Sequence, residues 1–195
     1  MKTVVIKYNA GNVQSVLFAL ERIGANAILS DDAETISNAD KVIFPGVGEA
    51  GSAMNYLKEK NLDKVIKSLT QPVLGICLGM QLLCAHSEES NTECLGIFSE
   101  NVKRFPTDKN YKVPHVGWNT IYHLKSPLFY HCKEDYVYFV HSYYVETGVH
   151  SIAQCNYILP FSASIQKNNF YACQFHPEKS GSIGELILKN FMNLK

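Results

Sequence analysis

The chain has 195 residues, enough for one domain with a full hydrophobic core and too few for two ordinary domains. Its 18 Lys and Arg balance its 18 Asp and Glu, and no basic cluster stands out, so neither nucleic acid nor an anionic membrane is an expected partner. The apolar run near the N-terminus is too short for a signal peptide or a membrane span, which predicts a cytoplasmic protein. The six cysteines are scattered without a C-x-x-C pair, so we expect no disulfide, no metal and no cofactor.

The first half of the chain alternates short apolar strands with helical segments. Strands are expected at residues 3–8, 27–29, 41–44 and 72–76. Helices are expected after the N-cap residue Asn12, between residues 50 and 69, and over residues 78–86. Alternating strands and helices are typical of a parallel sheet covered on both faces, in which ligands bind at the carboxyl ends of the strands.

The second half, from residue 98 to residue 175, is rich in short β segments separated by turn residues. We expect antiparallel strands that extend or flank the parallel sheet. The last helix is expected to begin near Ser182, with Ser182 and Glu185 forming a capping box. The chain contains no repeat, linker or low-complexity tract, so residues 1–195 are expected to form a single domain.

A cysteine stands where the strand at 72–76 gives way to the next helix, in the pattern Gly75-x-Cys77-x-Gly79. This pattern is a nucleophile elbow with sulfur in place of the serine hydroxyl. Two glycines leave room for the sharp turn, and a thiol at a helix N-terminus is favoured in its thiolate form. Unpaired cysteines are also common as small buried residues, so the motif alone leaves both interpretations open.

A histidine and a glutamate follow the last predicted strand, in the segment Gln174-Phe-His-Pro-Glu-Lys179. If the backbone stays extended, His176 and Glu178 point to the same side. A carboxylate beside an imidazole fixes its tautomer and stabilises the imidazolium form. Together with Cys77 these residues would supply a base and an orienting carboxylate for nucleophilic catalysis. The alternative, a surface histidine beside a proline turn, is disfavoured by the presence of the elbow.

Covalent acyl transfer also needs hydrogen-bond donors for the developing oxyanion. The N–H of Leu78, directly after the nucleophile, is one candidate. The N–H groups of the Gly46-Val47-Gly48 turn, which follows the strand at 41–44, are the other. A plain type II turn would explain the same Pro-Gly pair, and the position of this turn beside Cys77 is an inference from topology.

The segments PGVG, GICLGMQLL and QFHPEKS, in this order and spacing, resemble those of class I glutamine amidotransferases. The whole chain aligns in outline with their flavodoxin-like glutaminase domain, which implies an α/β fold with a central, mostly parallel sheet and an antiparallel β extension in the C-terminal half. Within the class, four segments are similar to the glutaminase subunits of imidazole glycerol phosphate synthases: KYNAGNVQSV, PGVGEAGSAM, PHVGWN and YFVHSY. Val116 departs from that subfamily, which more often has methionine there.

The resemblance implies a reaction and a partner. Cys77 would attack the side-chain amide of glutamine, and His176 would assist the release of ammonia and the hydrolysis of the thioester to glutamate. The ammonia would pass to a cyclase subunit, which forms a heterodimer with this one and makes imidazole glycerol phosphate and aminoimidazole carboxamide ribotide in histidine biosynthesis. The oxyanion donors would be Val47 and Leu78, and the substrate would be held by Gly48, Gln81, Ser142 and Tyr143. The residues expected at the partner interface are Asn12, Pro114, Trp118, Asn119, Tyr138 and Lys179.

Three other functions compete with this interpretation. A papain-like peptidase usually has its histidine well over a hundred residues after the cysteine, whereas Cys77 and His176 are 99 positions apart (176 − 77). A regulatory subunit without catalysis would not need the triad residues, although sequence does not show that they assemble. Glutaminases that serve anthranilate, aminodeoxychorismate or GMP synthesis would lack the segment at residues 114–119.

Overall fold

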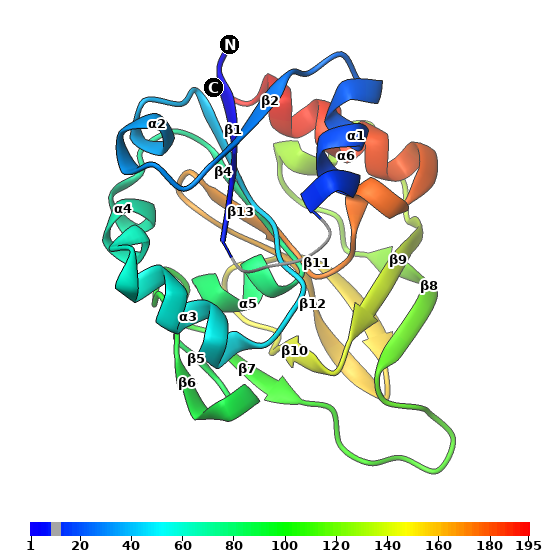
Figure 1. Cartoon of the computed structure of the whole chain (residues 1–195). Coiled ribbons are helices and arrows are strands. Elements are labelled where there is room, and N and C mark those ends of the chain that lie inside the picture. Colours follow the sequence, from blue (N-terminus) through cyan, green and yellow to red (C-terminus); the bar gives the residue numbers. More distant parts are fainter. Residues whose placement is uncertain (9–12) are drawn as a thin grey trace.

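The computed structural model describes residues 1–8 and 13–195, so the expected N-cap Asn12 lies outside the described residues. Five strands form the parallel part of one sheet, in the order β2-β1-β3-β4-β13 (Figure 1). They are β1 (Thr3–Ile6), β2 (Ala27–Ser30), β3 (Lys41–Phe44), β4 (Val73–Ile76) and β13 (Phe170–Cys173). The predicted parallel sheet is therefore confirmed.

The sheet continues beyond β13 with mostly antiparallel pairs, as predicted for the second half of the chain. Along the main path follow β12 (Leu159–Lys167), β10 (Tyr143–Val145), β7 (Asn101–Arg104), β5 (His86–Ser87) and β6 (Thr92–Glu93). A branch of three strands leaves this path at β12: β11 (Ser151–Tyr157) pairs with β12, β8 (His115–Tyr122) pairs with β11, and β9 (Asp135–His141) pairs with β8. The antiparallel pair β8 and β9 lies beyond the parallel part of the sheet, on the side away from α2 and α4 in Figure 1.

Helices cover both faces of the parallel part (Figure 1). One face packs against α1 (Val13–Arg22) and α6 (Gly181–Asn193). The other face packs against α2 (Ala33–Ser37), α3 (Ala50–Glu59), α4 (Leu62–Ser68) and α5 (Leu78–Leu83). Alternation along β1 builds both cores, because Val4 and Ile6 enter one and Val5 enters the other. Short 3₁₀ turns occur at η1 (Glu89–Asn91), η2 (Pro127–Phe129) and η3 (Pro177–Lys179).

One helix boundary differs from the expectation, and one short helix was not predicted. The helix expected over residues 78–86 ends at Leu83, because the chain becomes extended at Cys84 and His86 pairs with β7. The polar stretch after β2 holds the short helix α2, where the Asp32 carboxylate accepts the N–H of Thr35 at 2.7 Å. Such an N-cap compensates for an N–H group that has no partner inside the helix.

The expected capping box of the last helix was also wrong. Helix α6 begins at Gly181, close to the expected start, but its N-cap is Ser180 rather than Ser182. The Ser180 hydroxyl donates to the His176 carbonyl at 2.6 Å and accepts the N–H of Tyr138 at 3.0 Å. Glu185 points instead to α1, where it accepts a hydrogen bond from Arg22 at 3.3 Å.

No helix among residues 1–8 and 13–195 is both long enough and apolar enough to cross a membrane.

Gly79 in α5 provides a test of how tightly β3 and the elbow are packed. Replacing a helical glycine with alanine normally stabilises a helix by up to about 1 kcal/mol. A Cβ at Gly79 would lie 1.9 Å from the backbone oxygen of Phe44, so we expect Gly79→Ala to lower the free energy of unfolding by about 2 kcal/mol or more. The matched control is Gly51→Ala in α3, where the nearest atoms belong to the side chains of Glu49 and Ser90.

Urea denaturation of the two variants measures the difference. The expectation is a clear loss for Gly79→Ala and a change of less than about 1 kcal/mol for Gly51→Ala. Equal stabilities of the two variants would contradict the close contact between α5 and the end of β3.

Candidate active site

Cys77 occupies a strained turn between β4 and α5. Its backbone lies at φ 53° and ψ −108°, in a region that residues with a side chain rarely adopt. The N–H of Cys77 donates to the carbonyl of Cys173 in β13 at 2.8 Å. Gly79 is required by contact, since a Cβ there would collide with the Phe44 carbonyl at the end of β3, whereas a Cβ at Gly75 would press on the Leu83 side chain and lie 3.1 Å from the Gly79 backbone. The strand, turn and helix that the motif predicted are therefore present.

His176 and Glu178 form a buried pair directly after β13. Nδ1 of His176 lies 2.8 Å from Oε1 of Glu178, and both side chains are almost fully buried. Because a carboxylate accepts hydrogen bonds, the proton lies on Nδ1 and leaves Nε2 for the side of Cys77. The N–H of His176 donates to the Tyr138 carbonyl at 2.9 Å, which fixes the backbone at this point.

The environment of His176 favours its charged form. Burial alone lowers the pKa of His176, but the negative charges of Cys77 and Glu178 and the hydrogen bond to Glu178 outweigh burial and raise this pKa to about 10. An imidazolium held between two negative groups is suited to giving a proton to a leaving amine. The structure thus brings together the three residues predicted as nucleophile, base and orienting carboxylate.

The two predicted oxyanion donors lie close together, but one of them is engaged. The N–H of Leu78 donates to the carbonyl of Gly46 at 3.3 Å. The peptide between Gly46 and Val47 is trans, so the N–H of Val47 points away from that carbonyl and from Leu78. In this conformation the loop after β3 therefore presents a carbonyl oxygen, rather than an N–H, to the position that an oxyanion would occupy.

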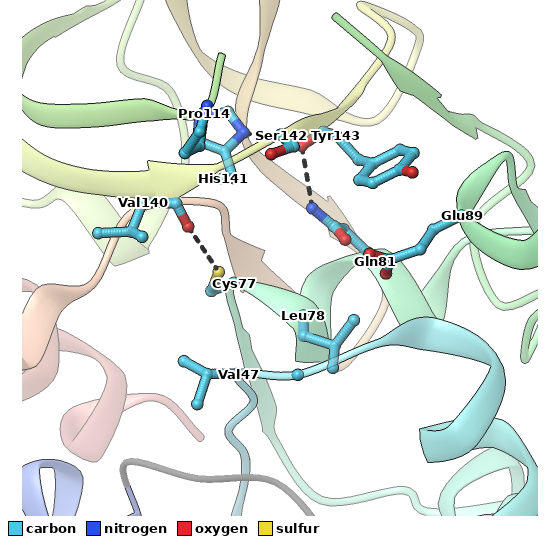
Figure 2. A pocket seen from close by; sticks show the side chains of 11 residues that line it. Val47, Cys77, Leu78, Gln81, Glu89, Pro114, Val140, His141, Ser142 and Tyr143 are labelled. Atoms are coloured by element: carbon cyan, nitrogen blue, oxygen red, sulfur yellow. Dashed lines mark hydrogen bonds between the residues drawn. The ribbon is translucent and has the colours of Figure 1, made fainter.

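A pocket opens beside the Cys77 thiol (Figure 2). It is lined by residues of the loop after β3, of α5 and η1, and of the chain around β8 to β10: Val47, Gly48, Cys77, Leu78, Gln81, Glu89, Pro114, Val140, His141, Ser142 and Tyr143. All four predicted substrate residues are among them. The pocket thus joins the nucleophile to the groups expected to hold the amino-acid end of the substrate.

Glu89 is a pocket residue that the sequence interpretation missed. Its Oε2 accepts the N–H of Ala50 at 2.9 Å at the start of α3, and burial raises the pKa of its carboxyl group. A carboxylate on the pocket wall can accept hydrogen bonds from a substrate ammonium group. The polar stretch around Glu89 carries no spacing that would mark one glutamate among its neighbours Glu88 and Glu93.

The outer face of the β8–β9 pair is apolar and exposed. In its register Val116 lies opposite Val140 and Trp118 lies opposite Tyr138, with the rings of the second pair 5.9 Å apart. Trp118 is 54% exposed and Val116 57%. We call this surface, made by Val116, Trp118, Tyr136, Tyr138 and Val140, the outer hairpin face.

The remaining predicted interface residues are divided between surfaces. Pro114 and Lys179 are exposed. Asn119 belongs to the opposite face of β8, where its side-chain amide donates to the Asn156 carbonyl at 3.1 Å. Asn12 lies outside the described residues.

Residues 4–194 match the model of the glutamine amidotransferase class-I family. A protein of Bacteroides fragilis (strain YCH46) named imidazole glycerol phosphate synthase subunit HisH is 59% identical over 196 residues, with both chains fully covered. The Escherichia coli (strain K12) protein of the same name is 46% identical over 197 residues, again with both chains fully covered. The chain belongs to the class I glutamine amidotransferase family.

Solved structures show the same fold at low sequence identity. A putative GMP synthase subunit from Thermoplasma acidophilum superimposes with a TM-score of 0.73 at 19% identity, covering 98% of this chain and 92% of that one. PurLQS from Thermotoga maritima gives a TM-score of 0.73 at 15% identity, covering 98% and 97% of the two chains.

The buried pair predicts the effect of neutralising Glu178. Glu178→Gln keeps the shape of the side chain but removes the charge that holds the Nδ1–H tautomer and stabilises the imidazolium. We expect the turnover number for glutamine hydrolysis to fall by roughly 10²- to 10⁴-fold, as for an orienting carboxylate in other triads. The matched control is Glu185→Gln, which removes the same charge from the exposed contact with Arg22. Near-normal turnover of Glu178→Gln would remove Glu178 from the catalytic machinery.

Proposed function

We propose that the chain is the glutaminase subunit of an imidazole glycerol phosphate synthase. It hydrolyses glutamine to glutamate and ammonia and passes the ammonia to a cyclase subunit. The observation that carries this proposal is the position of Cys77, which lines a pocket containing Gln81 and Glu89 and has the buried His176–Glu178 pair behind it. Full-length relatives that bear this name, at 46% and 59% identity, support the choice of synthase.

The chemistry follows from the order of groups around the thiol. The Cys77 sulfur attacks the amide carbon of glutamine, and the C–N bond breaks as His176 gives its proton to the departing nitrogen. This leaves ammonia and a glutamyl thioester. A water molecule that loses a proton to Nε2 of His176 then attacks the thioester, which releases glutamate and restores the thiolate and imidazolium.

Pocket groups account for recognition of the amino-acid end of glutamine. The Glu89 carboxylate and the side-chain oxygen of Gln81 are acceptors suited to the substrate ammonium group. Gly48, Ser142 and Tyr143 line the same pocket and would hold the substrate carboxylate. With its amino-acid end held in this way, glutamine would direct its side-chain amide toward Cys77.

The engaged N–H of Leu78 supports slow turnover by the isolated chain. An oxyanion hole made by Val47 and Leu78 requires the Gly46–Val47 peptide to flip. The flip would free the Leu78 N–H and direct the Val47 N–H at the oxygen on the reacting carbon. A subunit that released ammonia without a partner would waste glutamine, since ammonia in neutral water is mostly ammonium and no longer a nucleophile. We therefore expect the partner and its nucleotide substrate to stabilise the flipped conformation of the Gly46–Val47 peptide.

The outer hairpin face is the surface we assign to the cyclase subunit. It is apolar, it contains an aromatic pair, and large aromatic residues are enriched at protein interfaces. It also borders the reacting sulfur, because the thiol of Cys77 contacts the carbonyl of Val140 at 3.7 Å (Figure 2). A partner seated there would receive ammonia close to where it forms.

Glutamate release by the purified chain tests the function. We expect slow release by the chain alone, strong stimulation by a cyclase subunit with its ribonucleotide substrate, and no release by Cys77→Ala under either condition. High activity that the cyclase leaves unchanged would assign the chain to another synthase. Absence of activity under both conditions would favour a non-catalytic regulatory subunit.

Trp118 provides a test of the assigned partner surface. Trp118→Ala removes a large, half-exposed side chain from the centre of the outer hairpin face, so we expect the dissociation constant of the cyclase complex to rise by about tenfold or more. The matched control is Phe18→Ala on α1, since Phe18 is 53% exposed but lies on another surface. Titration calorimetry measures both variants. Equal affinities of wild type and Trp118→Ala would show that the cyclase binds elsewhere.

A further inference from the structure

Two histidines that the mechanism does not use face each other inside the β8–β9 pair. His115 and His141 are register partners, and they are 3% and 5% exposed. Their rings pack among aromatic side chains, with Phe139 and Tyr157 stacked on His115 and Phe105 and Phe161 against His141. Burial lowers the pKa of His115 to about 4 and that of His141 to about 3, so both rings are neutral near pH 7.

Hydrogen bonding fixes the tautomer of each ring. Nδ1 of His141 lies 2.7 Å from the carbonyl of Tyr143, which only accepts, so Nδ1 carries the proton and Nε2 is an acceptor. Nδ1 of His115 lies 2.9 Å from that Nε2, so it must be the donor. Nε2 of His115 is then the acceptor for the side-chain amide of Asn119, at 3.4 Å. The donors therefore all point in one direction, from β8 toward Tyr143.

The Tyr143 carbonyl connects this pair to the pocket and to the nucleophile. The Gln81 side chain donates to it at 3.0 Å (Figure 2) and donates its other N–H to Oε1 of Gln174 at 3.0 Å. Gln174 in turn donates to the Cys77 sulfur at 3.6 Å. Because both N–H groups of Gln81 are used inside the protein, its oxygen is the atom available to the pocket.

We propose that His115 and His141 are positioning residues for glutamine. His141 anchors the Tyr143 carbonyl, which orients Gln81 so that it presents an acceptor to the substrate ammonium group, and His115 holds His141 in the one tautomer that can do this. The inference rests on the proposed function, since it assigns the ammonium of glutamine to Gln81. His141 lines the pocket and His115 acts on it through His141, so we assign both to the shape and polarity of the pocket rather than to the reacting atoms.

Removal of the His115 donor has a defined consequence. His141 would keep Nε2 as a buried acceptor without a partner, which is costly, or would move its proton to Nε2. The second change leaves a bare Nδ1 against the Tyr143 carbonyl, and the two acceptors would repel each other. Either outcome disturbs the Gln81 carboxamide, and therefore the binding of glutamine rather than the chemistry at Cys77.

Two variants of nearly equal shape separate this role from simple packing. In His115→Asn the side-chain N–H occupies the place of Nδ1–H, whereas His115→Leu fills the same space without a donor. We expect the KM for glutamine, measured in the complex with the cyclase subunit, to rise by about tenfold or more for His115→Leu. The increase in KM should be several-fold smaller for His115→Asn, and kcat should change less than KM in both variants. His123→Leu, an exposed histidine of the same region, serves as the control and should leave KM unchanged.

A merely structural role would give a different pattern. Loss of folded protein lowers the active fraction and thus kcat, but it does not change KM. Wild-type KM in His115→Leu, or equal increases in the Leu and Asn variants, would overturn the proposal. If the wild-type chain released no glutamate at all, the proposed function would fail instead.

Nitrogen-15 NMR of the imidazole rings tests the pair without any activity. At neutral pH we expect both His115 and His141 to be neutral with the proton on Nδ1, and we expect the His141 signals to change in His115→Leu and to be retained in His115→Asn. An imidazolium or an Nε2–H tautomer at either wild-type ring would overturn the arrangement.

Discussion

The structure depends on one unfavourable backbone conformation, the turn with positive φ at Cys77. The turn directs the thiol away from the sheet, and α5 begins directly after it. A hydrogen bond from the Cys77 N–H to β13 stabilises the turn. It also requires α5 to pass close to the end of β3, where Gly79 touches the Phe44 carbonyl. The ends of β3, β4 and β13 are held close together around this turn. The nucleophile therefore lies beside both the loop after β3 and the histidine after β13.

The β8–β9 pair connects the surface assigned to the partner with the pocket assigned to the substrate. Its outer face is apolar and exposed, and its inner face carries the buried histidines that lead through Tyr143 and Gln81 to the pocket. A strand places alternate residues on opposite faces, so a partner on one side and the substrate site on the other share a single backbone. The carbonyls of Tyr138 and Val140, which contact His176 and Cys77, belong to the same strand.

Motifs with local geometry could be predicted from the sequence. The elbow at Cys77 and the pairing of His176 with Glu178 depend on neighbours two residues away, and the parallel sheet follows from the alternation of strands and helices. The particular hydrogen bonds between distant segments could not be predicted. Ser182 was predicted as the cap of α6, but the cap is Ser180, which bonds Tyr138, while Arg22 draws Glu185 to α1. The orientation of the Gly46–Val47 peptide, the place of Glu89 and the facing histidines likewise depend on tertiary packing.

Covalent catalysis by Cys77 requires a glutamyl thioester, which intact-mass spectrometry of the chain quenched during turnover can detect. We expect a species heavier by one glutamyl group, with the added mass on the peptide that contains Cys77, and its absence from Cys77→Ala. Glutamate release without any such adduct, or an adduct on a different cysteine, would show that Cys77 is not the nucleophile.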